Sequence, residues 1–394
     1  ELYDTIDKKV VWSDRWQEKW DNLPTIKMNL SDGFLKALDT KLKVARKVDT
    51  SNAEAYEYYL QANYYFHEFL KTLNIQNLKT AQSLIEKSIE LDKLFLTAML
   101  LLGRTYVFDN EINKDKKIKL NTKAQNIFEQ VLKQAQKLDN KLLQGRSLRN
   151  IGIVHSKTND LIGNKDAYDK ALDYYTQSLN IAIEIDDKVG MARSYNNIGV
   201  YYGGECEDDK ALEYHTCSLK LSEELGDKHG LGYNLLNIGG AYYYKGDLEK
   251  ALEYYDRSLK IREEISDKHG IGAILRNIGA VYYFKGDLEK ALEYYERSLK
   301  IREDISDKHG MRISFKIIGI VYWNKGDYGK AEKYLEKSIS VQKEIGYIGL
   351  EANTYLYLIY KHLGREYDIE KTHKLIKETE NIEFELNLRL YKLL

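Results

Sequence analysis

Proline, cysteine and long apolar runs are scarce in this chain. Its 394 residues include one proline, Pro24, and because proline interrupts helices, most of the chain is free to be helical. Two cysteines, Cys206 and Cys217, are too few for a disulfide scaffold or a zinc motif, and they fit a reducing cytoplasm. No apolar run approaches the roughly 18 residues of a membrane span, and no signal peptide is visible. We therefore expect a cytoplasmic, mostly helical protein without a membrane partner.

Neither sign of charge is in excess, with 60 Lys and Arg against 61 Asp and Glu. A general nucleic-acid binder needs a basic excess to displace counterions, so no nucleic-acid partner is expected. The 33 tyrosines exceed what a catalytic site could use, and they must be structural or line a surface. The chain begins with Glu1 rather than Met, and we interpret it as a piece of a longer protein.

Catalytic motifs are also missing: there is no Gly-x-Ser-x-Gly, P-loop, His-Glu-x-x-His or kinase signature. His229, His269 and His309 recur in Asp-Lys-His-Gly linkers, but a helix pair separates each from the next, so they cannot share one metal ion. Carboxylate pairs such as Glu263 and Glu264 are expected on solvated faces. We predict no catalytic residue, metal or cofactor in this chain, while the longer protein is free to carry a kinase or cyclase domain.

A 40-residue repeat dominates the middle of the sequence. Asn-Ile-Gly occurs at residues 197–199, 237–239 and 277–279, and Gly319 continues the series. Four alanines and four tyrosines keep the same spacing: Ala211, Ala251, Ala291, Ala331, Tyr202, Tyr242, Tyr282 and Tyr322. Within one unit, residues 230–245 and 248–265 are each predicted to be helical. Gly246 suits the left-handed C′ position and Asp247 the N-cap between them.

This pattern resembles the tetratricopeptide repeat, in a form with lengthened helices. That repeat carries a large residue, Leu-Gly and Tyr on its first helix and Ala and an aromatic residue on its second. One unit here matches with Ile238, Gly239, Tyr242, Ala251 and Tyr255, and serine replaces the last alanine in this unit and in the units on either side. The resemblance implies an all-α, right-handed superhelical solenoid of about eight helix hairpins. Small residues at the glycine and alanine positions would let paired helices approach closely.

The solenoid is expected to span residues 51–380, with seven extra residues in a loop around 158–164. Residues 381–394 would be a capping helix that covers its apolar end. Residues 1–50 do not fit the repeat, since 8–16 alternates like a strand and 29–42 reads as a helix. This segment resembles the junction in bacterial and archaeal kinase or cyclase regulators, where a TolB-like α/β domain precedes tetratricopeptide repeats. The resemblance implies that residues 1–42 are the tail of such a domain.

The first helices of tetratricopeptide repeats line a concave groove. By that resemblance four asparagines form a ladder there: Asn150, Asn197, Asn237 and Asn277. An amide both donates and accepts, so it pairs with a peptide backbone of any sequence, and kinesin light chain and the Leu-Gly-Asn adaptors carry similar ladders. Basic, amide and aromatic neighbours complete the predicted peptide site: Arg146, Arg149, Arg193, Asn196, Arg276, Lys316, Tyr243, Tyr244, Tyr283, Phe284 and Trp323.

The ladder has a second interpretation, in which each amide bonds to the adjacent helix pair and stabilises the stack. Some of the aromatic residues must also pack between repeats. Our leading hypothesis is a protein-interaction module that binds an extended, acidic segment of a partner or of its own longer chain, as the regulatory or scaffold part of a signalling protein. Two alternatives stay open. One is self-association into a homodimer, suggested by the apolar tail at 386–394; the other is small-ligand sensing.

Overall fold

The computed structural model describes residues 2–4, 9–12, 49–109, 114–347 and 349–366, and the chain divides into two compact units, Glu1–Ser51 and Asn52–Leu394. In the first unit β1 (Leu2–Asp4) pairs antiparallel with β2 (Lys9–Trp12), so part of the strand predicted at 8–16 is present. The helix predicted at 29–42, the capping helix at 381–394 and the apolar tail lie outside the described residues. The resemblance to a TolB-like junction stays a prediction.

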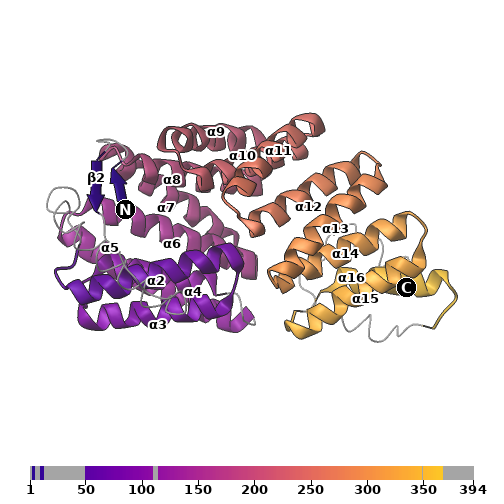
Figure 1. Ribbon diagram of the computed structural model, residues 1–394, viewed down its shortest axis with the longest axis horizontal. Helices are drawn as coiled ribbons and strands as arrows, with labels where there is room; N and C mark the ends of the chain where they lie inside the picture. The colour runs from indigo at the N-terminus through magenta and orange to yellow at the C-terminus, as the bar shows by residue number, and fades with distance from the viewer. Residues whose placement is uncertain (1, 5–8, 13–48, 110–113, 348, 367–394) are drawn as a thin grey trace. The chain divides into compact units, whose positions relative to one another are not determined.

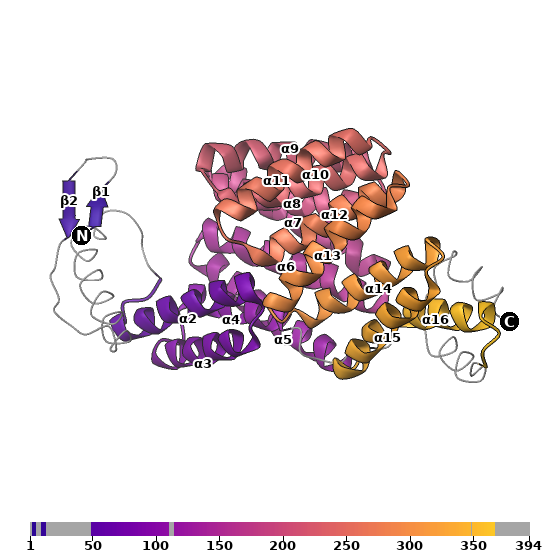
Figure 2. The same cartoon turned by 45° about the vertical axis from the view of Figure 1, so that its right-hand side comes forward.

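The described part of the second unit is an all-α solenoid of helix hairpins, in which each helix packs against the next in chain order (Figures 1 and 2). Seven hairpins are complete within the described residues, and α16 is the first helix of the next. The helices are α2 (Ala53–Thr72), α3 (Ile75–Leu91), α4 (Leu96–Phe108), α5 (Lys114–Lys137), α6 (Lys141–Ile162), α7 (Lys165–Glu184), α8 (Lys188–Gly204), α9 (Asp208–Leu225), α10 (Lys228–Tyr244), α11 (Leu248–Glu264), α12 (Lys268–Phe284), α13 (Leu288–Asp304), α14 (Lys308–Asn324), α15 (Tyr328–Glu344) and α16 (Leu350–His362).

The turn between α10 and α11 is set by glycine and aspartate, as predicted. Gly246 has a φ of 78°, a left-handed conformation that favours glycine, and it ends α10. The Asp247 side chain then accepts a hydrogen bond from the backbone N–H of Lys250 and caps α11. The predicted helices at 230–245 and 248–265 are therefore confirmed to within two residues.

Close packing inside each hairpin depends on the repeated small residues. A Cβ atom added to Gly239 would lie 2.7 Å from ring carbons of Tyr255, which is 2% exposed. Gly279 stands in the same relation to Tyr295. Ala251 is fully buried beside these rings. A larger side chain at the glycine would overpack the contact, so the predicted close approach of paired helices is confirmed.

The serine that replaces the last alanine of the repeat forms a buried hydrogen bond. Ser258 Oγ on α11 donates to the backbone carbonyl of Gly232 on α10 at 2.7 Å, and Ser298 does the same to Gly272 on the next hairpin. Four other serines donate to first-helix carbonyls in the same way: Ser88, Ser178, Ser218 and Ser338. Each bond ties the two helices of a hairpin at about 1 kcal/mol.

Buried ion pairs fasten one hairpin to the next near the end of the array. Arg302, at the end of α13, pairs at 2.6 Å with Asp307, the N-cap of α14, and each residue is 6% exposed. Asp307 also accepts from the backbone N–H of Gly310 at 2.9 Å. Arg262 and Asp267 repeat this pair one hairpin earlier. These carboxylates therefore act both as helix caps and as counter-ions.

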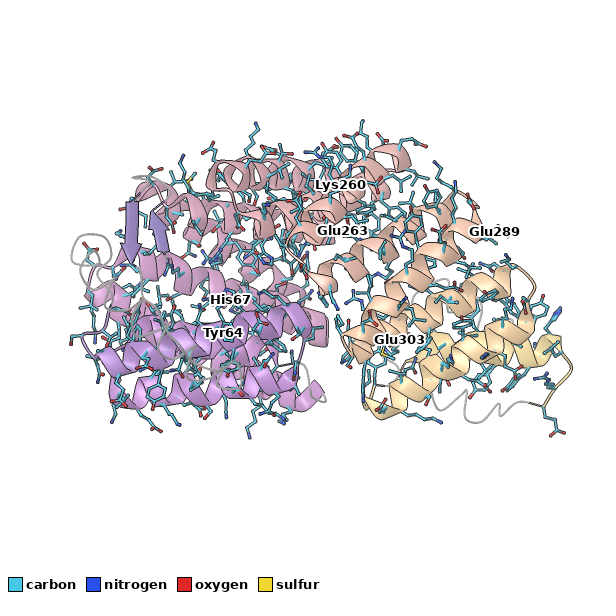
Figure 3. The ribbon with its side chains drawn as sticks, in the orientation of Figure 1. Tyr64, His67, Lys260, Glu263, Glu289 and Glu303 are labelled. Atoms are coloured by element: carbon cyan, nitrogen blue, oxygen red, sulfur yellow. The ribbon has the colours of Figure 1, made fainter. Side chains whose placement is uncertain are left out.

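Exposed ion pairs link the same hairpins along one edge of the array. Lys285, which follows α12, pairs with Glu249 of the preceding hairpin at 2.9 Å. Lys325 pairs with Glu289 at 2.7 Å, and Figure 3 marks Glu289 on α13. Lys245 joins Asp209 in the same way. Because solvent screens them, each contributes little to the stability of the array.

The seven extra residues predicted to form a loop around 158–164 lengthen two helices instead. Helix α6 runs for 22 residues where α8 has 17, and α7 begins early, at Lys165. Gly163, with a φ of 64°, ends α6, and the Asn164 side chain caps α7 by accepting from the N–H of Ala167. The loop prediction was wrong because no residue before Gly163 breaks the helix.

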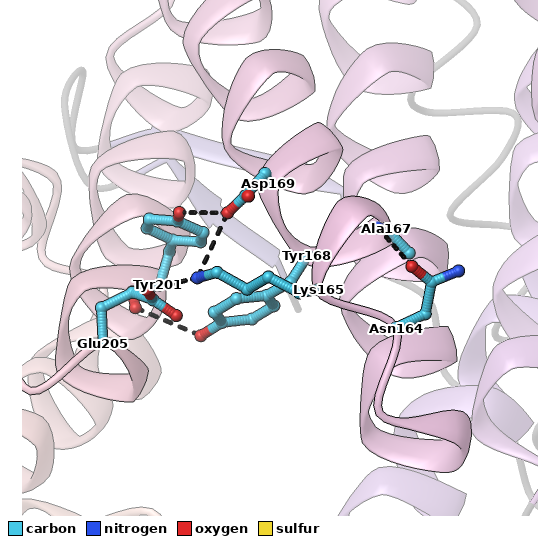
Figure 4. Close-up of polar contacts among 7 residues, drawn as sticks. All are labelled: Asn164, Lys165, Ala167, Tyr168, Asp169, Tyr201 and Glu205. Atoms are coloured by element: carbon cyan, nitrogen blue, oxygen red, sulfur yellow. Dashed lines mark hydrogen bonds and ion pairs between the residues drawn. The ribbon is translucent and has the colours of Figure 1, made fainter.

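Because α7 begins early, its first residues form a set of polar contacts with α8 (Figure 4). Tyr168 Oη donates to the backbone carbonyl of Tyr201 at 3.2 Å, and Tyr201 Oη donates to Asp169 at 2.7 Å. Lys165 pairs with Asp169 at 3.3 Å and with Glu205. Burial, and then the bond to Asp169, raises the pKa of Tyr201 to about 12, so its hydroxyl remains a donor at neutral pH.

Candidate functional site

The first helices from α2 to α12 lie next to one another in chain order and form one surface. Helix α6 contacts α4 and α8, α10 contacts α8 and α12, and α14 contacts α16. Among the described helices the second helices make no comparable contacts with each other. The first helices therefore form the more closely spaced row, which is the inner side of a curved stack. We call the surface of α4, α6, α8, α10, α12 and α14 the first-helix face.

The asparagine ladder lies on this face, and its members differ in what they contact. Asn237 Nδ2 on α10 donates to Asn196 Oδ1 on α8 at 3.1 Å, so this amide is used within the stack. Asn197 is half-buried and makes no hydrogen bond with a described residue. Asn150 is 6% exposed, and Asn277 accepts a long bond of 3.5 Å from the Arg276 side chain. Asn237 thus fits the interpretation in which the ladder stabilises the stack, whereas Asn197 makes no such bond with the described helices. Contact between the ladder and a peptide stays a proposal.

Arginines gather at the amino-terminal end of the face. Arg146 and Arg149 lie on α6, and Arg193 lies on α8. A fourth arginine, Arg104 on α4, was not predicted as a site residue, and it directly follows the signature glycine of a weak repeat unit. Its guanidinium lies 5.0 Å from the ring centre of Phe66. We call these four residues the arginine cluster.

The arginines of the cluster are close enough to repel one another. Burial, and then the charges of Arg193, Arg104 and Arg146, lowers the pKa of Arg149 to about 9. Burial, and then Arg193, lowers the pKa of Arg104 to about 10. Both remain charged at neutral pH. Arg149 is 8% exposed, and Asp187 is the carboxylate that acts on it, without an ion pair between them.

The predicted cations farther along the face are in different settings. Lys316 on α14 forms an ion pair with Glu351 on α16, so its charge is balanced within the stack. Arg276 on α12 is half-buried, and burial, then the charge of Arg302, lowers its pKa. Arg276 is the single arginine of α10 and α12, whereas four arginines lie on α4, α6 and α8.

Two of the predicted aromatic residues project from the face. Tyr244, at the end of α10, is 76% exposed, and Phe284, at the end of α12, is 69% exposed. The half-buried ring of Tyr243 lies between them, 5.4 Å from the Tyr244 ring and 6.1 Å from the Phe284 ring. We call these three residues the aromatic patch.

The other predicted aromatic residues are used within the stack. Tyr283 packs against the core of the hairpin that follows α12, and its hydroxyl accepts a hydrogen bond from Asn324. The Trp323 ring lies 5.1 Å from Tyr328 and 6.2 Å from Tyr355. The expectation that some of Tyr243, Tyr244, Tyr283 and Phe284 pack between repeats is confirmed for Tyr283.

Within the described ranges, from 49 to 109 and from 114 to 366 without 348, no group of three His, Cys, Asp or Glu residues could hold a metal ion. His215 is 3% exposed, and it occupies the position that Tyr255 has in the next unit. Burial lowers its pKa to about 4, so it is neutral at pH 7. Over the same ranges, none of the helices is both long enough and apolar enough to span a lipid bilayer.

Comparison with known proteins decides the nature of the repeat. A family model described as Tetratricopeptide repeat matches residues 164–224, 230–304 and 270–344. The helices between residues 164 and 344 are tetratricopeptide repeats. The search of curated protein sequences gives no match.

Several solved structures share this fold at low sequence identity. A Rap protein complexed with Competence and Sporulation Factor has a TM-score of 0.60 and 15% identity, over 86% of this chain and 89% of that one. NprR in complex with its cognate peptide NprX has a TM-score of 0.50 and 17% identity, over 81% and 87%. A signal transduction ATPase with a tetratricopeptide repeat sensor, from Pyrococcus horikoshii, has 0.53 and 21%, over 83% and 52%. The chain therefore spans only about half of that ATPase.

Proposed function

We propose that the chain is a protein-interaction module that binds an extended, acidic polypeptide segment on the first-helix face. The observation that carries this proposal is the aromatic patch. Tyr244 and Phe284 expose 76% and 69% of their surface on neighbouring first helices, although both rings are large enough to stabilise the stack if they were buried. A contiguous exposed apolar patch of this kind marks an interaction surface.

The rest of the face fits a segment that runs across several repeats. The half-buried amide of Asn197 has no bond within the described residues and is available to a ligand backbone. The arginine cluster supplies positive charge for acidic side chains. Because the helices are already packed, the receptor loses little conformational freedom on binding. Two proteins of the same fold, Rap and NprR, have been solved with Competence and Sporulation Factor and with the peptide NprX, respectively.

The module would serve as the regulatory or scaffold part of a larger protein. A rigid groove that is filled or empty could be coupled to an attached domain, and the ATPase with a tetratricopeptide repeat sensor has a related arrangement. Within this chain we assign no catalytic step to any residue.

The proposal is tested with a random peptide library displayed against the purified chain. We expect enrichment of sequences that combine acidic and apolar residues. Tyr244→Ala and Phe284→Ala should each weaken an enriched peptide by about 5- to 30-fold, the usual range of 1–2 kcal/mol for an aromatic anchor. The matched control is Ile183→Ala, since Ile183 is an exposed apolar residue, at 51%, on second helix α7.

Calorimetry or fluorescence anisotropy with the enriched peptide gives the affinities. The proposal is wrong if no peptide is enriched, or if the Ile183 variant loses as much affinity as the two aromatic variants.

A further inference from the structure

We propose that the arginine cluster binds the phosphate group of a phosphorylated side chain in the segment that occupies the first-helix face. This assignment rests on the proposed function and makes it more specific. The site consists of Arg104 on α4, Arg146 and Arg149 on α6, and Arg193 on α8, which come from three consecutive hairpins.

The first argument is the cost of the cluster in the absence of a ligand. Arg149 is 8% exposed, yet it has no ion pair within the described residues, and its neighbours Arg104, Arg146 and Arg193 all disfavour its charge. A buried charge without a counter-ion is destabilising. Elsewhere the same chain provides a carboxylate for each such arginine, as Asp307 does for Arg302. The missing counter-ion of Arg149 is explained if an anionic group of the ligand takes its place.

The second argument concerns the kind of anion. A carboxylate carries one negative charge and is matched by one guanidinium fork. The charges of Arg104, Arg146 and Arg193 all act on Arg149, and Asp187 is the acidic group that partly offsets it. A phosphate monoester carries between 1.5 and 2 negative charges and three strong acceptor oxygens, so it can accept from several forks at once. Phosphate therefore neutralises more of the cluster than any single acidic side chain.

The positive charge is greatest at the amino-terminal end of the face. On α10 the position of Arg149 is occupied by Leu236, and on α12 it is occupied by Arg276, which is the single arginine of these two helices. One hairpin farther, Lys316 is already paired with Glu351. A uniformly acidic ligand would be served by charge along the whole face. The observed distribution instead suits one strongly anionic group at one end and an apolar group at the aromatic patch.

Arginine side chains on three hairpins also imply a mechanical effect. A phosphate held by α4, α6 and α8 would cancel the repulsion between these helices and hold the three hairpins together. Occupation of the site should therefore raise the resistance of this segment to unfolding, in addition to anchoring the ligand.

The test uses three blocked tripeptides, Ala-phosphoserine-Ala, Ala-Asp-Ala and Ala-Ser-Ala, together with inorganic phosphate, titrated by calorimetry at constant ionic strength. We expect the phosphorylated peptide to bind about tenfold or more tightly than the Asp peptide, because several charge-assisted bonds replace one. Arg193→Gln, at an exposed position, should weaken phosphopeptide binding about fivefold or more. Arg149→Lys, which retains the charge but loses the planar fork, should also weaken it.

The matched control is Arg257→Gln, which removes an exposed arginine from second helix α11 and should leave binding unchanged. Equal affinity for the Asp and phosphoserine peptides would overturn the phosphate assignment and leave a general acidic-peptide surface. Phosphate binding that is insensitive to Arg193→Gln would identify an adventitious ion only and would also overturn it. Because these probes contain no apolar anchor, the result is independent of the library experiment on the aromatic patch.

Discussion

Removing the carboxylate of a buried ion pair should destabilise the array far more than removing the same carboxylate where it is only a cap. Asp307→Asn retains the side-chain oxygen that accepts from Gly310, so little of the capping energy is lost. It deprives Arg302, which is 6% exposed, of its counter-ion. Loss of one member of a buried pair typically costs 3–5 kcal/mol, and because asparagine still accepts one hydrogen bond we expect about 3 kcal/mol.

The chain contains its own control for this experiment. Asp227 caps α10 by accepting from Gly230 at 3.0 Å, but it is exposed, and the residue that corresponds to Arg302 is Ser222. Asp227→Asn should therefore cost less than about 1 kcal/mol. Adding Arg302→Ser to the Asp307→Asn variant, which reproduces the serine of that earlier hairpin, should recover part of the loss.

Hydrogen exchange read by mass spectrometry is the suitable assay, because repeat arrays open locally and a single unfolding free energy does not describe them. Protection of α13 and α14 should fall in the Asp307 variant, while α9 and α10 should be nearly unchanged in the Asp227 variant. Urea unfolding measures the loss of stability summed over the whole array. Equal losses for the two variants would refute the conclusion that burial of the charge, rather than capping, determines the cost.

Three further results are expected. As pH falls from 6.5 to 4, the free energy of unfolding should fall by up to about 3 kcal/mol, because the lowered pKa of His215 lets only the unfolded state take up the proton. In the His215→Tyr variant, the urea midpoint should therefore depend less on pH over this range. Gly239→Ala should lose about 1–3 kcal/mol by overpacking, whereas Gly240→Ala, whose Cβ meets only an atom at 3.8 Å, should gain up to 1 kcal/mol in the same assay. Asn237→Ala should lower stability by about 1 kcal/mol and Asn197→Ala should not, with peptide affinity measured separately for both.

Features repeated along the chain were predictable because one local cause acts in every unit. Gly246 and Asp247 determine a turn by their own backbone and side-chain preferences, and Gly239 reports a close contact that no larger residue tolerates. The loop expected at 158–164 failed for the opposite reason. An insertion relative to neighbouring units was taken as irregular structure, although its residues are compatible with helix up to Gly163.

The candidate site was less predictable because it is assembled from several hairpins. Arg104 belongs to a weak unit, and only its approach to arginines on α6 and α8 makes it part of a cluster. Similarly, Tyr283 and Phe284 are neighbours in sequence, but whether each ring is exposed depends on what the next hairpin places beside it. Contacts of this kind are set by the relative rotation of helices, which a pattern within one unit does not contain.

The edge ion pairs have a consequence for how such an array can grow. The hairpin of α10 and α11 carries Lys245, which pairs with the preceding hairpin, and Glu249, which pairs with Lys285 of the following one. In a tandem copy of residues 228–267, the new Lys245 would therefore meet the original Glu249, and the new Glu249 would meet Lys285. The array can therefore become longer or shorter by whole hairpins while the ion pairs between neighbouring hairpins still form.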